Sequence, residues 1–267
     1  QSMLAGAKMA QLSQVFGSAK AVESATTGGF LLGAIGDMET EDAMQRMINL
    51  QQQLGFMYGD LTKAQFDLLE PEQQRAVILS ETIETLDKLN EVENTSAATI
   101  SGITFAMTRF ASTAKLANTE IEEMIALSAF LIESGEEQGK AGTSLKMMYM
   151  RLAVNTSNNN EVLKQHGVAV RDARGEMKSL VTIMGELRTN TDDQGRAWAD
   201  LGSEEQAHIA ASIAGKRHAE RFLKLMVNFD RVVELQTNSI NSSGSALHEW
   251  GRVVKTDQMQ IKILTQE

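Results

Sequence analysis

The residues most able to do chemistry are Glu205 and His208, which have a Glu-x-x-His spacing. On a helix this spacing presents two ligands to one metal ion, as in di-iron helical bundles. A complete site of that kind needs a second such pair and two more inward glutamates, and the other three histidines have no Glu three residues ahead. We therefore interpret Glu205 and His208 as an ordinary surface pair, with Glu204 able to contact His208 across one helical turn.

A glycine-rich run, Gly28 to Gly36, superficially resembles a phosphate-binding loop. Such loops follow a β-strand and end in Lys-Ser or Lys-Thr, and neither feature is present here. The run is also too short for a membrane helix, which needs about 20 apolar residues. We expect a buried helix end or a tight packing point. The paired Gly28-Gly29, after Thr26-Thr27, should break the first helix because glycine carries the largest backbone entropy cost.

The densest basic cluster forms a partial stripe on one expected helix and consists of Lys216, Arg217, Arg221 and Lys224. No aromatic residue interleaves on that face to stack on bases, so we interpret the cluster as a solvated face, with nucleic-acid contact as the alternative. Adjacent acids point in different directions on a helix or lie in loops, and we expect them to be solvated: Glu122-Glu123, Glu136-Glu137 and Asp192-Asp193.

No nucleophile elbow, zinc-protease helix or kinase motif set occurs. We therefore predict no catalytic, cofactor-binding or metal-binding residue, and we expect that the chain is not an enzyme. A methionine-rich stretch, Met147, Met148 and Met150, is typical of core packing, and the alternative is an adaptable helix-groove interface.

Composition narrows the fold class. The chain has 267 residues, 42% of them hydrophobic, and a net charge of −10, which argues against a general nucleic-acid or anionic-lipid binder. The absence of Cys excludes disulfides, thiolate nucleophiles and Cys-type zinc sites. One Pro and 5% aromatic residues disfavour a sandwich or barrel, so we predict an all-α protein. It begins at Gln1 without an initiator Met or signal peptide, and we expect a piece of something longer.

Apolar residues recur at helical spacing through most of the chain. Capping signals mark helix starts at Thr40, at Thr62 with Gln65, at Asn118-Thr119 with Glu122, and at Ser203 with Gln206. Pro71 should open a long helix. The expected helices cover residues 3–22, 40–57, 62–70, 72–92, 94–117, 121–132, 139–154, 181–187, 204–214, 222–235 and 246–264, and we expect a loop at 155–160.

The pattern changes to alternation between Gly167 and Leu180, where Val168 and Val170 alternate and Asp172 to Gly175 supply turn residues. This stretch predicts one small β-hairpin near 168–178 in an otherwise helical, glycine-interrupted array. We divide the chain into leading amphipathic helices (1–93), a core with the hairpin (94–228) and C-terminal helices (229–267), and we find no exact internal repeat.

Three blocks in fixed order carry a family resemblance: GKAGTSLKMMYMRLA (139–153), EVLKQHGVAVRDARGEMKSLVTIMGEL (161–187) and IAGKRHAERFLKLM (213–226). Their helix starts, Gly-Val-x-Val-x-Asp turn and Gly-Lys-Arg helix resemble the core region of phage tail tape measure proteins over roughly 94–228. The positions that match are Gly142, Thr143, Leu145, Leu152, Gly167, Val168, Val170, Asp172, Gly175, Leu180, Gly215 and Arg217. The chain departs from the family pattern at four positions. Ser144 stands where the family often has Ala, Ala214 replaces the Phe that commonly precedes the last glycine, and His218 and Glu220 are more polar than usual.

The resemblance implies a virion protein of the phage tail, assembled in the bacterial cytoplasm, that sets tail length, occupies the tube lumen or hub and is released at genome ejection. It implies no catalytic residue in this region. The implied partners are further copies of the chain (a homo-oligomer, with a trimer among the candidate states), the tail-tube protein, baseplate hub proteins and tail assembly chaperones, without specific nucleic-acid binding. A helix advances about 1.5 Å per residue, which suits a ruler.

Two alternatives remain at this point. One is a metal-binding helical bundle enzyme built around Glu205 and His208. The other is a cytoplasmic helical adaptor with no viral role.

Overall fold

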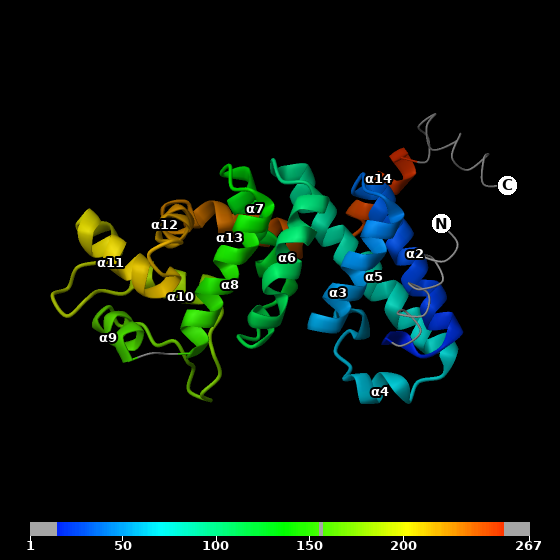
Figure 1. Ribbon diagram of the computed structural model, residues 1–267, viewed down its shortest axis with the longest axis horizontal. Helices are drawn as coiled ribbons and strands as arrows, with labels where there is room; N and C mark the ends of the chain where they lie inside the picture. Colours follow the sequence, from blue (N-terminus) through cyan, green and yellow to red (C-terminus); the bar gives the residue numbers. More distant parts are fainter. Residues whose placement is uncertain (1–14, 155–156, 254–267) are drawn as a thin grey trace. The chain divides into compact units, whose positions relative to one another are not determined.

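The computed structural model describes residues 15–154 and 157–253 (Figure 1). The prediction of an all-α protein is confirmed, since the described residues form helices and contain no strand. They separate into two compact units: one contains the described residues up to Thr95, residues 99–101 and those from Asn238 onward, and the other contains residues 96–98 and 102–237. No helix within the described ranges is long and apolar enough to cross a membrane.

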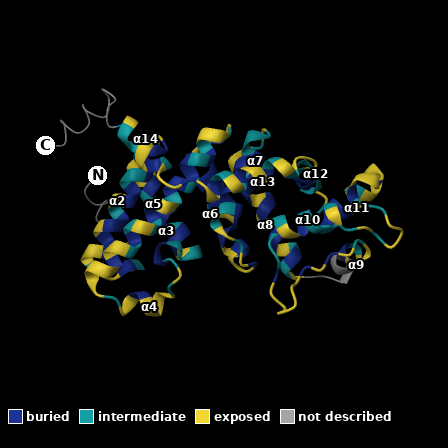
Figure 2. Ribbon diagram, turned by 180° about the vertical axis from the view of Figure 1, so that it is seen from behind, coloured by how far each residue is buried: buried dark blue, intermediate teal, exposed yellow. Residues whose placement is uncertain are grey.

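The first unit contains helices from both ends of the described chain. They are α2 (Ala19–Ile35), α3 (Thr40–Leu54), the 3-10 turn η1 (Phe56–Tyr58), α4 (Lys63–Asp67), α5 (Pro71–Thr95) and α14 (Ser245–Val253). Helix α5 contacts α2, η1 and α14, and α2 also contacts α3 and α14. Short α4 is largely exposed (Figure 2). Its Phe66 is fully buried.

The glycine run does not break α2, which continues through Gly28, Gly29 and Gly33 and ends with Gly36 as its C-cap, so the prediction of a break after Thr27 is wrong. Gly28 and Gly29 are buried, and a Cβ on Gly28 would lie 2.5 Å from Thr82 Cγ2 on α5. A Cβ on Gly29 would lie 2.6 Å from Met44 Cγ on α3. Close helix packing therefore offsets the entropic cost of glycine in a helix interior. The tight packing point expected here is confirmed.

A buried carboxylate on α5 fixes the start of α14. Asp87 accepts hydrogen bonds from the backbone N–H groups of Gly244 and Ala246, each at 2.8 Å. Beside it, the amide of Asn90 donates to the hydroxyl of Ser245 at 2.7 Å. An acid is favourable at a helix N-terminus because the first N–H groups there have no partner within the helix.

The second unit consists of consecutive helices. They are α6 (Ile100–Lys115, whose first two residues belong to the first unit), α7 (Ile121–Glu133), α8 (Gln138–Val154), α9 (Ser157–Gln165), α10 (Leu180–Thr189), the 3-10 turn η2 (Trp198–Asp200), α11 (Ser203–Ala214), α12 (Ala219–Val227) and α13 (Phe229–Ile240, the last three residues of which belong to the first unit). Helix α7 packs on α8 and α12, and α11 packs on α8, α9 and α12.

One buried acid joins three of these helices. Glu123 of α7 is 4% exposed, and its carboxylate accepts the hydroxyl of Tyr149 from α8 and the backbone N–H of Val181 at the start of α10, both at 3.0 Å. Burial raises the pKa of Glu123, while hydrogen bonds from Ser179, Val181 and Tyr149 act in the opposite direction. The Tyr149 ring also stacks on Phe110, with centroids 5.9 Å apart. Glu123, expected to be a solvated acid, is therefore part of the core.

The predicted β-hairpin near 168–178 is wrong. Within residues 168–178 the single bridge joins Arg171 and Met177, and it is isolated, so neither side of the turn forms a strand. Val168 and Val170 instead belong to an irregular segment that buries both side chains. Alternating burial alone does not distinguish such a segment from a strand.

Helix boundaries show further agreement and error. The capping box of Thr62 and Gln65 and the helix start at Pro71 are confirmed. The expected loop at 155–160 is wrong for 157–160, which belong to α9, while 155–156 lie outside the described residues. The expected helices at 3–14 and 254–264 also lie outside them. The predicted caps at Thr40, Asn118-Thr119 and Ser203 are wrong. The N-cap residues of α3, α7 and α11 are Glu39, Glu120 and Gly202.

Candidate functional site

Two loops of the second unit have the same geometry, 20 residues apart. In the first, the carboxylate of Asp172 accepts the N–H groups of Arg174 and Glu176 at 2.8 and 2.9 Å. In the second, Asp192 accepts those of Gln194 and Arg196 at 2.9 and 2.8 Å. Each loop has an isolated bridge at its base and a glycine with positive φ, 82° at Gly175 and 76° at Gly195. They form a local repeat that turns the chain from one helix to the next.

In the second loop Arg196 makes ion pairs with two carboxylates. Its Nε donates to Asp192 Oδ2 at 2.9 Å, and Nη1 and Nη2 donate to Glu205 at 3.0 and 2.8 Å. The hydrogen bond from Arg196 lowers the pKa of Glu205, and those from the Arg196 backbone and side chain lower that of Asp192. Glu205 also accepts the N–H of Gly202 at 3.2 Å. The network joins the loop to the first turn of α11, and bidentate arginine–carboxylate pairs are geometrically specific.

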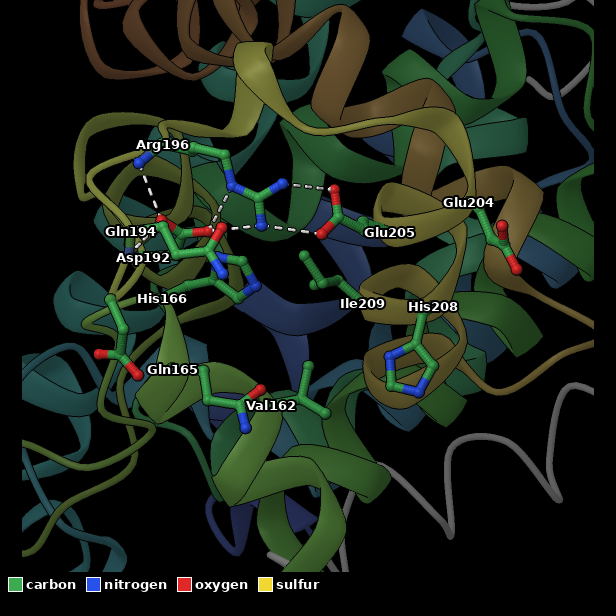
Figure 3. Close-up of a pocket in the computed structure, with 11 residues that line it drawn as sticks. Val162, Gln165, His166, Asp192, Gln194, Arg196, Glu204, Glu205, His208 and Ile209 are labelled. Carbon is green, nitrogen blue, oxygen red and sulfur yellow. Dashed lines mark hydrogen bonds and ion pairs between the residues drawn. The ribbon is translucent and has the colours of Figure 1, made fainter.

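This network forms one wall of a pocket of about 560 Å³ (Figure 3). Its lining comes from α9, the second loop and α11: Val162, Gln165, His166, Asp192, Asp193, Gln194, Arg196, Glu204, Glu205, His208 and Ile209. Ile209 is buried and His208 is exposed. The lining thus combines four acids, two amides, two histidines, one arginine and two apolar side chains.

The Glu205–His208 pair lies in this pocket but does not converge on one point. The Glu205 carboxylate is directed to Arg196, and the His208 imidazole points away from it (Figure 3). Among the described residues, no group of three His, Cys, Asp or Glu side chains is arranged to hold a metal ion. The arrangement supports a structural role for Glu205, since the guanidinium competes with any metal for its oxygens.

The basic cluster is partly neutralised by Glu136, which lies between the end of α7 and the start of α8. Arg221 Nε donates to Glu136 Oε2 at 2.6 Å and Lys224 Nζ to Glu136 Oε1 at 2.7 Å. Burial alone would raise the pKa of Glu136, but the hydrogen bonds from Lys224 and Arg221 outweigh it and the net direction is down. The neighbouring Arg231 donates to both oxygens of Glu133 at 2.9 and 3.1 Å. Half of the cluster therefore holds helices together instead of forming a solvated face.

Two departures from the family pattern contact each other. The hydroxyl of Ser144, fully buried on α8, lies 2.9 Å from Nδ1 of His218, and it also donates to the carbonyl of Lys140 at 2.7 Å. Burial and the charges of Arg221 and Arg217 lower the pKa of His218. The pair is a contact between α8 and the start of α12. Sequence reasoning noted both residues but had no means of pairing them across 74 positions.

The methionine-rich stretch divides between core and surface. Met148 is fully buried, Met147 is half-buried, and Met150 is 40% exposed. Core packing is thus confirmed for Met148, while the exposed methionine leaves the alternative of an interface open. The repeated Asp loop was missed because the two copies share only the Asp-x-x-Gly spacing, which was the available signal.

Comparison with known proteins identifies the class. Residues 4–215 match the family described as phage-related minor tail protein, so the chain belongs to that family, which has a structural role in phage tails. Over 140 residues it is 29% identical to the probable tape measure protein of Escherichia phage P2, which confirms the resemblance drawn from the three blocks. The aligned region is 52% of this chain and only 17% of that relative. No solved structure shows significant similarity.

Proposed function

We propose that this chain is a segment of a tape measure protein that helps to set tail length, occupies the tail-tube lumen or hub and is released when the genome is ejected. The observation that carries the proposal is the match to the probable tape measure protein of phage P2, within a chain that belongs to the minor tail protein family. The helical architecture supports it, because helix length increases in proportion to residue number.

The proposed role is structural and requires no catalytic centre. The pocket is consistent with it, since the acids Asp192 and Glu205 both bind Arg196. As partners we propose further copies of the chain, the tail-tube protein, baseplate hub proteins and tail assembly chaperones, with assembly in the host cytoplasm. No described feature favours the adaptor alternative.

An in-frame deletion of residues 15–253 in the encoding phage tests the length role. Tails should become shorter, by at most roughly 360 Å if the segment were one continuous helix at 1.5 Å per residue. Tail lengths measured by electron microscopy give the result. Gly185→Ala is the matched control, because it alters a side chain in an ordinary contact without changing residue number and should leave tail length unchanged. Tails of normal length after the deletion contradict a ruler role for this segment.

A further inference from the structure

Helices α6 and α8 differ in charge from the rest of the chain. Together they contain Arg109, Lys115, Lys140, Lys146 and Arg151 and not one Asp or Glu. The whole chain has 35 acids against 25 bases. The bases of these two helices are not offset by an acid on either helix, and a local excess of positive charge favours oppositely charged partners.

The two helices lie side by side and run in the same direction. Phe105, Ala106 and Phe110 of α6 contact Gly139, Gly142 and Tyr149 of α8, in the same order along both helices. A Cβ on Gly142 would lie 2.3 Å from the carbonyl oxygen of Ala106 and 2.9 Å from Arg109 Cβ. Arg109 therefore lies at the seam between the two helices, so that the outward sides of α6 and α8 form one surface.

We define the α6–α8 face by six residues that are exposed or half-buried: Phe105, Arg109, Thr143, Lys146, Met150 and Val154. The last four recur at intervals of three or four on α8, which places them on one side of that helix. Met150 is 40% exposed and Val154 67%. The guanidinium of Arg109 lies 4.9 Å from the centre of the half-buried Phe105 ring. The face thus combines two cationic groups, Arg109 and Lys146, with three apolar ones, Phe105, Met150 and Val154.

We propose that the α6–α8 face docks a partner helix that is both acidic and amphipathic. Carboxylates of that helix would pair with Arg109 and Lys146, and its apolar residues would cover Met150 and Val154. A flexible methionine adapts to such a partner, and helices commonly bind through apolar residues spaced by one turn. A nucleic acid fits less well, because phosphates do not cover exposed aliphatic side chains. The inference goes beyond the tail role and does not depend on it.

A designed peptide of about 21 residues, spanning roughly 30 Å as a helix, provides the probe. It repeats Leu-Glu-Glu-Leu-Leu-Glu-Glu, carries a fluorophore and is titrated with the full 267-residue chain while its anisotropy is measured. We expect saturable binding that weakens as salt is raised, because the charges on the face are exposed to solvent. A peptide with Lys in place of Glu should not bind.

Variants locate the binding surface. Lys146→Glu and Arg109→Glu should each weaken peptide binding by about tenfold, and Met150→Ala by about threefold, since charge reversal adds repulsion whereas truncation removes only apolar contact. Lys164→Glu, at an exposed position of α9, is the matched control for charge and should bind the peptide as the unmodified chain does. Circular dichroism checks that each variant remains helical.

Several results would overturn the proposal. One is that the acidic peptide does not bind at millimolar concentrations of the chain. A second is that the lysine peptide binds equally well. A third is that Lys164→Glu loses as much affinity as Lys146→Glu. A short DNA duplex that binds in place of the peptide, with the same dependence on Lys146, would assign the face to nucleic acid instead.

Discussion

Helix α2 in the first unit and the α7–α8–α12 region in the second unit are packed by different means. Helix α2 approaches its neighbours through glycines, with Gly28 against Thr82 and Gly29 against Met44. The second region is joined by ionisable side chains: Glu123 of α7 binds the start of α10, Glu136 before α8 binds α12, and His218 before α12 contacts α8. Contacts through glycine tolerate almost no added volume, because protein interiors are close-packed. Ionisable contacts tolerate changes of volume better but depend on protonation and on an intact partner.

The largest expected effect tests the glycine side of this comparison. Gly28→Val should lower the free energy of unfolding of the first unit by about 3 kcal/mol, because overpacking forces the buried Thr82 and its helix to move. Hydrogen exchange of α2 and α5 amides measures the change, and α8 amides should keep their protection. Gly185→Ala is the control, since its new Cβ would lie 3.4 Å from the Phe229 ring, an ordinary contact. Unchanged α2 protection in Gly28→Val would show that α2 has room for a side chain.

The next effect tests the buried acid. Glu123→Ala should destabilise the second unit by about 2 kcal/mol, because the Tyr149 hydroxyl and the Val181 N–H lose their common acceptor inside the core. Urea unfolding monitored by tyrosine fluorescence provides the measurement. Glu122→Ala on the next residue is the control, with a small expected effect because that side chain is half-buried. If both variants unfold at the same urea concentration, Glu123 does not join these helices.

The contact between Ser144 and His218 should contribute less to the free energy of unfolding than Glu123 does. Ser144→Ala and His218→Ala should each cost about 1 kcal/mol, and the double variant should cost less than the sum of the two. A double-mutant cycle from urea unfolding tests whether the residues interact. A coupling energy of zero would mean that the 2.9 Å contact contributes nothing to stability.

The smallest effect is a difference in pH response. Hydrogen bonds from Lys224 and Arg221 lower the pKa of Glu136 in the folded protein. Ionised Glu136 therefore stabilises the folded state above the ordinary pKa of 4.5, and this stabilisation is lost as pH falls through the folded-state pKa. The pKa of His218 is also lowered, so protonation below pH 6.5 acts in the same direction. Burial raises the pKa of Glu81 and Glu93 on α5, so that helix becomes more stable as pH falls toward 4.5.

Hydrogen exchange at pH 6.5 and 4.0, corrected for intrinsic rates, should therefore show α12 opening more easily at low pH and α5 less easily. Each change should be below about 1 kcal/mol once solvent screening is allowed for. Glu136→Gln should reduce the response of α12 and leave that of α5 unchanged. Parallel shifts in both helices would remove the proposed distinction between the two regions.

Local signals in the sequence predicted much of the helical structure. The capping box at Thr62, the proline start at Pro71 and the stripe of α7 are properties of neighbouring residues, and each identified a helix that the structure contains. The errors occurred where local preference and tertiary packing disagree. Gly28 and Gly29 have low helix propensity yet remain helical, because the absent side chains allow α3 and α5 to approach.

The sequence by itself determined the helical class, the relationship to phage tail proteins and the helix starts at Thr62 and Pro71, since these depend on composition and on residues close together in the chain. Tertiary structure decided that Glu123 is buried, that Ser144 meets His218 and that Glu136 holds Arg221 and Lys224. These pairs join residues far apart in sequence, and their chemistry follows from burial and distance, which no spacing pattern specifies. The same holds for the α6–α8 face, which exists because Gly142 allows two acid-free helices to lie together.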